Sequence, residues 1–152
     1  MNSKIIPLSA ENYRKCSNIW NMDKHHELAR RCYEELLSGN RRIFVYTEQD
    51  EYIGEGALVF DDNGDPDYTI LGKRIYFSRM VVKKEYRNKG IGTEILAFLV
   101  DYARELGYSE MSVGVDIDNI GARWLYEKNG FTKIIFVGED DGGKYVKLLK
   151  KL

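Results

Sequence analysis

The spacing of hydrophobic and polar positions along the chain predicts alternating strands and helices. The clearest helix spans residues 91–106, because apolar side chains recur every three or four positions and Gly107 follows as a stop signal. Three more helices are expected over residues 10–20, 23–38 and 119–129. In the second of these, Asp23 is expected to be the N-cap, and one apolar stripe consists of Leu28, Cys32, Tyr33, Leu36 and Leu37.

Shorter apolar or alternating segments predict strands over residues 5–8, 42–47, 52–60, 73–83, 111–115, 131–137 and 145–149. The segments "EQDE" and "DDNGDPD" are typical of turns, and such short links favour antiparallel pairing of the strands that they join. The resulting order, βααβββαβαββ, predicts an α/β protein of the α+β type with a mixed, largely antiparallel central sheet flanked by helices. Because the chain has 152 residues, we expect a single domain over residues 1–152.

Charge and cysteine content argue against several classes of function. The 23 basic and 24 acidic side chains nearly cancel, so nothing indicates a general nucleic-acid or membrane-surface binder. The longest apolar run, residues 95–100, is far shorter than the roughly 20 residues of a membrane span, so we expect no membrane-spanning helix. Because the N-terminal segment is polar, we also expect no signal peptide. Cys16 and Cys32 form no CxxC motif, which fits buried thiols in a reducing cytoplasm.

The segment "RNKGIG", Arg87 to Gly92, lies between a predicted strand and the clearest predicted helix. Such a junction leaves backbone N–H groups unpaired at the positive end of the helix dipole. Gly90 and Gly92 would let a ligand approach the backbone closely, while Arg87 and Lys89 add positive charge, which favours phosphate or pyrophosphate. For a lone GxG, a tight turn with two surface cations is the simpler interpretation.

The segment "RNKGIG" can be compared with three known phosphate-binding motifs. A Walker loop requires GxxxxGK[ST], which is absent, and a dinucleotide fingerprint requires a third glycine where Ile95 stands. "RNKGIG" instead resembles the R/Q-x-x-G-x-G/A signature of the GNAT superfamily of N-acetyltransferases. "NIGARWLYEKNGF", Asn119 to Phe131, resembles the N-x-x-A-x-x-L-Y-x-K-x-G-F segment of the same superfamily at unbroken spacing, and "RMVV", Arg79 to Val82, resembles its central strand.

This resemblance implies the GNAT fold and acetyl-coenzyme A (acetyl-CoA) as cosubstrate. It implies that the coenzyme's pyrophosphate is held around the glycines, by Arg87, Asn88, Lys89, Gly90, Ile91, Gly92 and Thr93. It also implies that the pantetheine arm is bound along Met80, Val81, Val82, Asn119, Ala122 and Tyr126, with one main-chain N–H of the central strand aimed at the thioester oxygen.

Tyr126 matches the superfamily position whose phenol faces the coenzyme sulfur and can donate a proton as the thiolate leaves. By itself, a tyrosine four residues after Ala122 on a short helix is typical of core packing, and Asn119 is typical of an N-cap. The motif favours the acid role for Tyr126 and adds a pantetheine contact to the capping role of Asn119.

The general base is less clearly marked. Some superfamily members carry a glutamate on the central strand at the position where this chain has Tyr76. Glu55 on the preceding strand is our first candidate, and Ser78 and Asp116 remain alternatives that would act through water.

Two predicted turns are rich in acidic side chains, "DDNGDPD" at residues 61–67 and "GEDDGG" at residues 138–143. A calcium loop would require glycine where Pro66 stands and glutamate where Gly72 stands, so we expect no metal. If the two turns flank the entrance for the acceptor, their field would favour a cationic amine, such as a polyamine, an aminoglycoside or a lysine-bearing peptide.

Together these observations predict an N-acetyltransferase that moves an acetyl group from acetyl-CoA to a primary amine by direct attack in a ternary complex. A non-catalytic acyl-CoA-binding module and a nucleotide phosphate-binding domain are the alternatives. The expected partner is a small-molecule or peptide amine rather than nucleic acid or membrane, and a homodimer is compatible with the family. The sequence leaves the acceptor and the acyl-chain length open.

Overall fold

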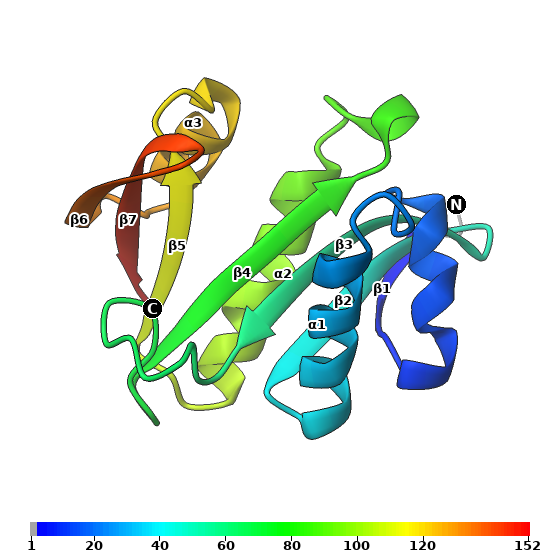
Figure 1. Ribbon diagram of the computed structural model, residues 1–152, viewed down its shortest axis with the longest axis horizontal. Helices are drawn as coiled ribbons and strands as arrows, with labels where there is room; N and C mark the ends of the chain where they lie inside the picture. Colours follow the sequence, from blue (N-terminus) through cyan, green and yellow to red (C-terminus); the bar gives the residue numbers. More distant parts are fainter. Residues whose placement is uncertain (1–2) are drawn as a thin grey trace. The chain divides into compact units, whose positions relative to one another are not determined.

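The computed structural model describes residues 3–152 and contains the predicted order of strands and helices (Figure 1). The strands are β1 (Ser3–Pro7), β2 (Arg41–Glu48), β3 (Glu51–Val59), β4 (Arg74–Val82), β5 (Glu110–Asp116), β6 (Lys133–Asp140) and β7 (Gly143–Lys151). The helices are α1 (His26–Ser38), α2 (Ile91–Glu105) and α3 (Ile120–Lys128), with 3₁₀ segments η1 (Ala10–Asn18) and η2 (Lys84–Tyr86).

The strands form a seven-stranded sheet in the order β1-β2-β3-β4-β5-β7-β6. β4 and β5 pair in parallel, whereas β1 with β2, β5 with β7, and β6 with β7 are antiparallel. The prediction of a mixed, largely antiparallel sheet with flanking helices is therefore confirmed.

The chain divides into two compact parts. The first part comprises the residues up to Leu58 together with Arg79–Leu99, and the second comprises Val59–Ser78 and Val100–Leu152. Both β4 and α2 contribute residues to each part. The expectation of one domain over residues 1–152 stays a prediction.

In the first part, β2 buries side chains on both of its faces, which explains its nearly continuous apolar sequence. Ile43 and Val45 belong to the core cluster shared with η1 and α1, which includes both cysteines as free, buried thiols. Phe44, between them in sequence, contacts Phe98 of α2 instead, with ring centroids 5.2 Å apart. This alternation follows from the period of two along a strand.

Gly56 allows α2 to pack closely against β3. A Cβ atom at this position would lie 2.5 Å from Cγ2 of Ile95 and 2.9 Å from Cδ1 of Leu99. Gly56→Ala is therefore expected to lower the free energy of unfolding by about 1–3 kcal/mol, as overpacking of a dense core does. Chemical denaturation measures this change, and Gly121→Ala is the control, because a Cβ there meets no atom within 4 Å. Equal stability of the two variants would contradict this packing.

Two details of the predicted helices are wrong. α1 begins at His26, and His25 occupies the N-cap position without a side-chain cap bond. Asp23 instead forms an exposed ion pair with Arg14 at 3.1 Å. Leu37 is exposed rather than buried in the apolar stripe, because the face of α1 turned toward the core is centred on Ala29 and Cys32.

In the second part, the register of β5 and β7 places polar side chains of both strands on one face of the sheet. Gly114 of β5 pairs with Lys147 of β7, and Asp116 pairs with Tyr145 two residues further along. Gly114 leaves room for the phenol of Tyr68, with which a Cβ would collide. The segment before β4 therefore covers this face of β5, and the Ser112 hydroxyl donates to the Tyr68 carbonyl at 2.6 Å.

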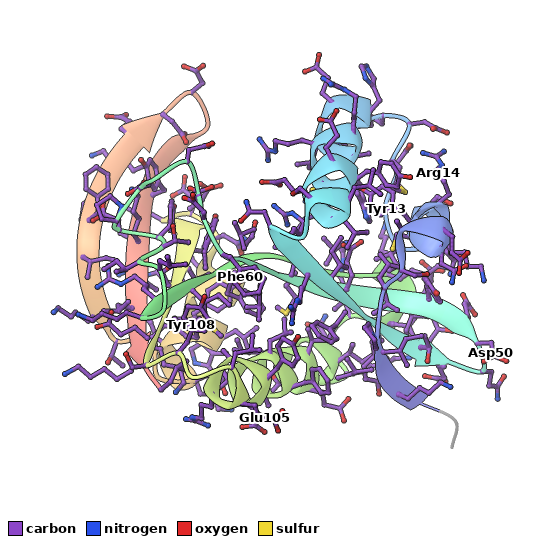
Figure 2. The ribbon with its side chains drawn as sticks, turned by 90° about the horizontal axis from the view of Figure 1, so that it is seen from below. Tyr13, Arg14, Asp50, Phe60, Glu105 and Tyr108 are labelled. Atoms are coloured by element: carbon purple, nitrogen blue, oxygen red, sulfur yellow. The ribbon has the colours of Figure 1, made fainter. Side chains whose placement is uncertain are left out.

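The second part also holds the end of α2 and the turn that follows it. Gly107 has a φ of 91°, the left-handed conformation that ends a helix, so the predicted stop signal is confirmed. Figure 2 labels Phe60 and Tyr108, whose ring centroids lie 6.2 Å apart beside this turn.

Candidate functional site

The loop that precedes α2 is the first candidate site and belongs to the first compact part. Arg87 donates from Nε to the carbonyl oxygen of Val82 at 2.9 Å. Asn88 and Gly90 have positive φ angles of 63° and 85°. The N–H of Glu94 then donates to the Gly90 oxygen at 3.1 Å, which begins the helix. Gly90 is thus the position at which the turn favours glycine.

The backbone N–H groups of residues 88–93 donate to no acceptor within residues 3–152. They lie at the positive end of the α2 dipole, and the flanking Arg87 and Lys89 are exposed. This arrangement is suited to an anion such as phosphate. Gly92 lies inside α2 and has no positive φ, so its value to such a site is close approach rather than an unusual backbone conformation.

The predicted pantetheine-binding strand residues, Met80, Val81 and Val82, form the end of β4 and are half-buried. The side chain of Val81 packs on the core cluster of the first part. The Val82 carbonyl already accepts the Arg87 bond, although a carbonyl oxygen can accept a second one. The side chains of these three residues therefore contribute to packing, and any binding of pantetheine by this strand would be through its backbone groups.

Glu55 of β3 lies in a buried polar cluster of the first part and is only 3% exposed. Its Oε1 accepts a 2.6 Å hydrogen bond from Nε1 of Trp20, and the Cys16 thiol is a second hydrogen-bond partner. Burial raises the pKa of the Glu55 carboxyl, while Arg79, Trp20, Arg41 and Cys16 oppose the rise. A raised pKa brings a carboxylate closer to the range useful for a base near neutral pH.

This raised pKa predicts a pH-dependent difference in stability between the wild type and Glu55→Gln. At pH values below the ordinary glutamate pKa, the carboxyl is protonated in both the folded and the unfolded chain. As the pH rises toward the higher folded-state pKa, the unfolded chain releases its proton first and the wild type loses stability. Glutamine does not ionise, so thermal unfolding should show the stability of the variant rising relative to that of the wild type as the pH increases above the ordinary glutamate pKa.

Glu51→Gln provides a control of opposite sign. Hydrogen bonds from Asn18 and Lys83 lower the pKa of the exposed Glu51 carboxyl. The ionised Glu51 carboxylate stabilises the folded chain at pH values above the pKa of this group in the unfolded chain. The stability of Glu51→Gln relative to the wild type should therefore fall as the pH rises. Parallel pH trends in the two variants would contradict the environment assigned to Glu55.

Tyr126 of α3 is the central residue of the second part's candidate site. Its side chain is 8% exposed, with ring centroids 6.1 Å from Phe77 and 5.8 Å from Phe131. Burial, and secondarily Tyr76, raises the pKa of the phenol to about 12. Within residues 3–152 its hydroxyl forms no hydrogen bond. Tyr126 is therefore both a packing residue, as its helical spacing suggests, and a protonated phenol.

Asn119 is the N-cap of α3, as predicted. Its Oδ1 accepts a hydrogen bond from the N–H of Ala122 at 3.2 Å. The cap occupies the oxygen of the side-chain amide and leaves its two N–H donors for another partner. The capping role and a ligand contact are therefore chemically compatible.

A polar pocket of about 450 Å³ lies within the second part. Tyrosines, carboxylates and one lysine dominate its lining, which consists of Asp65, Tyr68, Tyr76, Gly114, Val115, Asp116, Asn119, Ala122, Tyr126, Asp140, Tyr145 and Lys147. Tyr126, Asn119 and Ala122 of the predicted site therefore share one pocket with Asp116, the alternative base. The other alternative, Ser78, is a half-buried residue of β4.

Sequence reasoning missed three residues that shape these sites. Trp20 donates a hydrogen bond to Glu55, and Cζ of Arg79 lies 4.3 Å from the centroid of the Trp20 ring. The buried Nε of Arg79 has no hydrogen-bond partner among the described residues. Lys147 binds Asp65 and Asp67 at 3.0 and 3.2 Å, so two of the predicted acidic turn residues are already paired. The alternation of β7 places Lys147 on one face, but nothing local reveals its distant partners.

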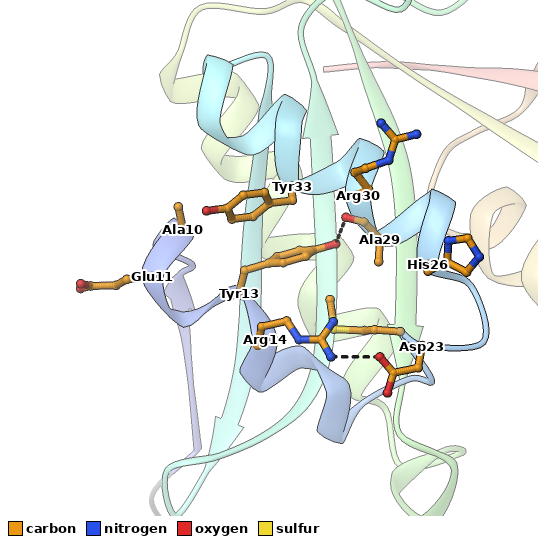
Figure 3. A pocket seen from close by; sticks show the side chains of 10 residues that line it. Ala10, Glu11, Tyr13, Arg14, Asp23, His26, Ala29, Arg30 and Tyr33 are labelled. Atoms are coloured by element: carbon orange, nitrogen blue, oxygen red, sulfur yellow. Dashed lines mark hydrogen bonds and ion pairs between the residues drawn. The ribbon is translucent and has the colours of Figure 1, made fainter.

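A further pocket, of about 410 Å³, lies between η1 and α1 (Figure 3). The Tyr13 hydroxyl donates to the Ala29 carbonyl at 2.7 Å across its floor, and Arg14 pairs with Asp23 at its rim. None of the predicted site residues lines it. Over residues 3–152, no group of three or more histidine, cysteine or acidic side chains is placed to hold a metal. None of the helices in this part of the chain has the length and hydrophobicity of a membrane-spanning segment.

Comparison with known proteins relates these features to a family. The acetyltransferase (GNAT) family matches residues 6–131. This chain belongs to that family. The match includes the loop before α2, Glu55 and Tyr126, so both compact parts contribute to the region shared with other GNAT proteins.

Individual relatives agree with this assignment. N-alpha-acetyltransferase 30 of Schizosaccharomyces pombe is 29% identical over 90 residues, which are 59% of this chain and 57% of that protein. The matched part of the chain thus spans little more than half the length of this relative. N-acetyltransferases are therefore among the curated homologues.

Solved structures show the same fold. A GNAT family acetyltransferase from Elizabethkingia anophelis with acetyl-CoA bound has a TM-score of 0.74 and 19% identity, covering 99% of both chains. The aminoglycoside 6'-acetyltransferase type Ii has a TM-score of 0.77 and 19% identity, covering 97% of this chain and 96% of that one. At these identities the likeness establishes the GNAT fold and nothing finer.

Proposed function

We propose that the protein is an acetyl-CoA-dependent N-acetyltransferase that acetylates a primary amine by direct attack in a ternary complex, without a covalent enzyme intermediate. The observation that carries the proposal is the run of backbone N–H groups at residues 88–93, which have no acceptor in the described chain and open α2 within the R-x-x-G-x-G motif. Membership of the GNAT family and the acetyl-CoA bound by a structural neighbour support it.

The residues present suit this coenzyme. The N–H groups of residues 88–93 would hold the pyrophosphate, helped by Arg87 and Lys89. Backbone groups of Met80, Val81 and Val82 and the free amide donors of Asn119, next to Ala122, would hold the pantetheine arm. When bound, acetyl-CoA supplies an activated acetyl thioester and a thiolate leaving group.

Two side chains would carry the proton transfers. Glu55, whose pKa is raised by burial, would accept the proton of the ammonium form of the acceptor through water, because only the neutral amine is a nucleophile. Tyr126, whose pKa of about 12 keeps the phenol protonated near neutral pH, would donate its proton to the departing thiolate. The nitrogen loses a further proton as the amide forms, which restores the Tyr126 phenol, and the proton taken up by Glu55 passes to solvent. The net change is one amide and one thiol formed from an ammonium group and a thioester, with one proton released.

Amine-dependent thiol release tests this proposal. The full chain is mixed with acetyl-CoA and each member of a panel of primary amines and peptides, and free thiol is measured with time. We expect release that depends on the amine and matches the acetylated product in amount. Tight binding of acetyl-CoA without such release would identify a non-catalytic acyl-CoA-binding module. Equal binding of ADP and coenzyme A would favour a nucleotide phosphate-binding domain.

A further inference from the structure

We propose that the pocket of the second compact part recognises a second positive charge on the acceptor, so that the preferred amines are organic dications rather than monoamines. This inference rests on the proposed function, because it concerns the acceptor of the same reaction. It follows from the charges of the pocket, its aromatic walls and the state of the Tyr126 hydroxyl.

The pocket has an excess of negative charge. Lys147 neutralises Asp65, with Nζ 3.0 Å from Oδ2, and also contacts Asp67. Asp116 and Asp140 also line the pocket, and neither forms an ion pair with any residue in the described chain. Two carboxylates therefore remain uncompensated within about 450 Å³, a volume suited to a small organic cation.

Four tyrosines supply the walls: Tyr68, Tyr76, Tyr126 and Tyr145. One of these rings already contacts an ammonium group of the protein, because Nζ of Lys147 lies 4.6 Å from the centroid of the Tyr68 ring. The Tyr68 and Tyr76 rings stack with centroids 4.1 Å apart, which fixes this wall in place. Aromatic faces beside carboxylates attract ammonium groups through both cation–π and charge interactions.

The hydroxyl of Tyr126 gives the pocket a hydrogen-bonding group that no residue of the described chain uses. More than nine-tenths of this side chain is buried, yet its hydroxyl has no hydrogen-bond partner in residues 3–152 and the residue lines the pocket. Since the buried polar atoms without a partner in residues 3–152 belong to arginines, this hydroxyl is accessible from the pocket and can donate to a ligand or to water there. Because Tyr126 is also the proposed acid, the reacting amine and its second charge would share this one pocket.

A direct binding experiment tests the inference without relying on turnover. 1,4-Diaminobutane and butylamine have the same carbon chain and differ by one ammonium group. Each is titrated calorimetrically into the full chain saturated with coenzyme A, at low and high salt. We expect the diamine to bind at least roughly tenfold more tightly at low salt, with a smaller preference at high salt because screening weakens the attraction.

Matched variants locate the effect. Asp116→Asn and Asp140→Asn remove the two uncompensated charges, whereas Asp118→Asn and Asp141→Asn remove the same charge from nearby positions that do not line the pocket. The preference for the diamine should disappear when Asp116 and Asp140 are both replaced and persist when Asp118 and Asp141 are both replaced. Equal binding of the two amines by the wild type, or equal losses in both double variants, would overturn the inference.

The outcomes separate this inference from the proposed function. If the diamine binds with the expected dependence on Asp116 and Asp140 but no amine releases thiol, the proposed reaction is wrong and the cation site stands. If butylamine is acetylated with the same KM as the diamine, the reaction stands and the cation site is wrong.

Discussion

Replacing Tyr126 with phenylalanine is expected to lower the turnover number by about 10²-fold, the usual loss when a proton donor is removed, while acetyl-CoA affinity barely changes. The phenol is protonated near neutral pH because burial and Tyr76 raise its pKa to about 12. Phenylalanine keeps the ring contacts with Phe77 and Phe131. The hydroxyl has no hydrogen bond to lose within the described residues, so the free energy of unfolding should not fall.

Tyr108→Phe is the matched control. Tyr108 also packs its ring in the second part, against Phe60, and its hydroxyl has no hydrogen bond with any described residue. Turnover of this variant should equal that of the wild type. If Tyr126→Phe retained full turnover under conditions where chemistry limits the rate, Tyr126 would be a packing residue only.

The second large effect is expected from Gly92→Val, which should weaken acetyl-CoA binding by at least roughly 100-fold. Charge-assisted hydrogen bonds contribute about 1.5–3 kcal/mol each, and a branched side chain at the start of α2 would displace the ligand from at least two of the N–H groups there. Gly92 has no positive φ, so backbone strain makes no contribution to the loss expected for valine at this residue. That strain belongs to Gly90, whose φ is 85°.

Ala97→Val separates obstruction of the loop from a general effect on the helix. Ala97 is exposed on α2, so this change adds valine to the same helix away from its N-terminus. Isothermal titration should show wild-type affinity for acetyl-CoA in Ala97→Val and a large loss in a folded Gly92→Val. Unchanged binding by Gly92→Val would remove the loop from the coenzyme site.

Most of the fold could be predicted because local signals agree with one another. The helix that begins near Ile91 combines a regular apolar period with Gly107, and the structure places its end within two residues of the prediction. The N-cap of α1 could not be predicted in the same way. Asp23 has a suitable side chain, but Arg14 of η1 binds it, and such a partner nine residues away leaves no local pattern.

The candidate site was predictable where motifs are local and unpredictable where residues meet through the sheet. Arg87 to Gly92 and Asn119 to Tyr126 are continuous segments, so their resemblance to GNAT motifs is visible in the sequence. The partners of Glu55 do not belong to one continuous segment with it, because Trp20, which donates a hydrogen bond to Glu55, stands 35 residues earlier in the chain. Lys147 pairs with Asp65 across 82 residues, because the register of β7 and the segment before β4 bring them together. In the proposed cation site, Asp140 comes from the second predicted acidic turn, whereas Asp65 and Asp67 of the first turn are paired with Lys147 and Asp116 takes their place.

A single-turnover transfer of labelled acetyl groups tests the central claim most directly. The full chain, in excess over acetyl-CoA labelled in its acetyl group, is incubated alone and then with a primary amine such as 1,4-diaminobutane, and the label is traced to coenzyme, protein and amine. A GNAT enzyme acting by direct attack should leave the label on the coenzyme until the amine is added and then transfer it to the amine. Label that stays on the coenzyme with every amine tested, or that becomes attached to the protein before an amine is added, would contradict this account.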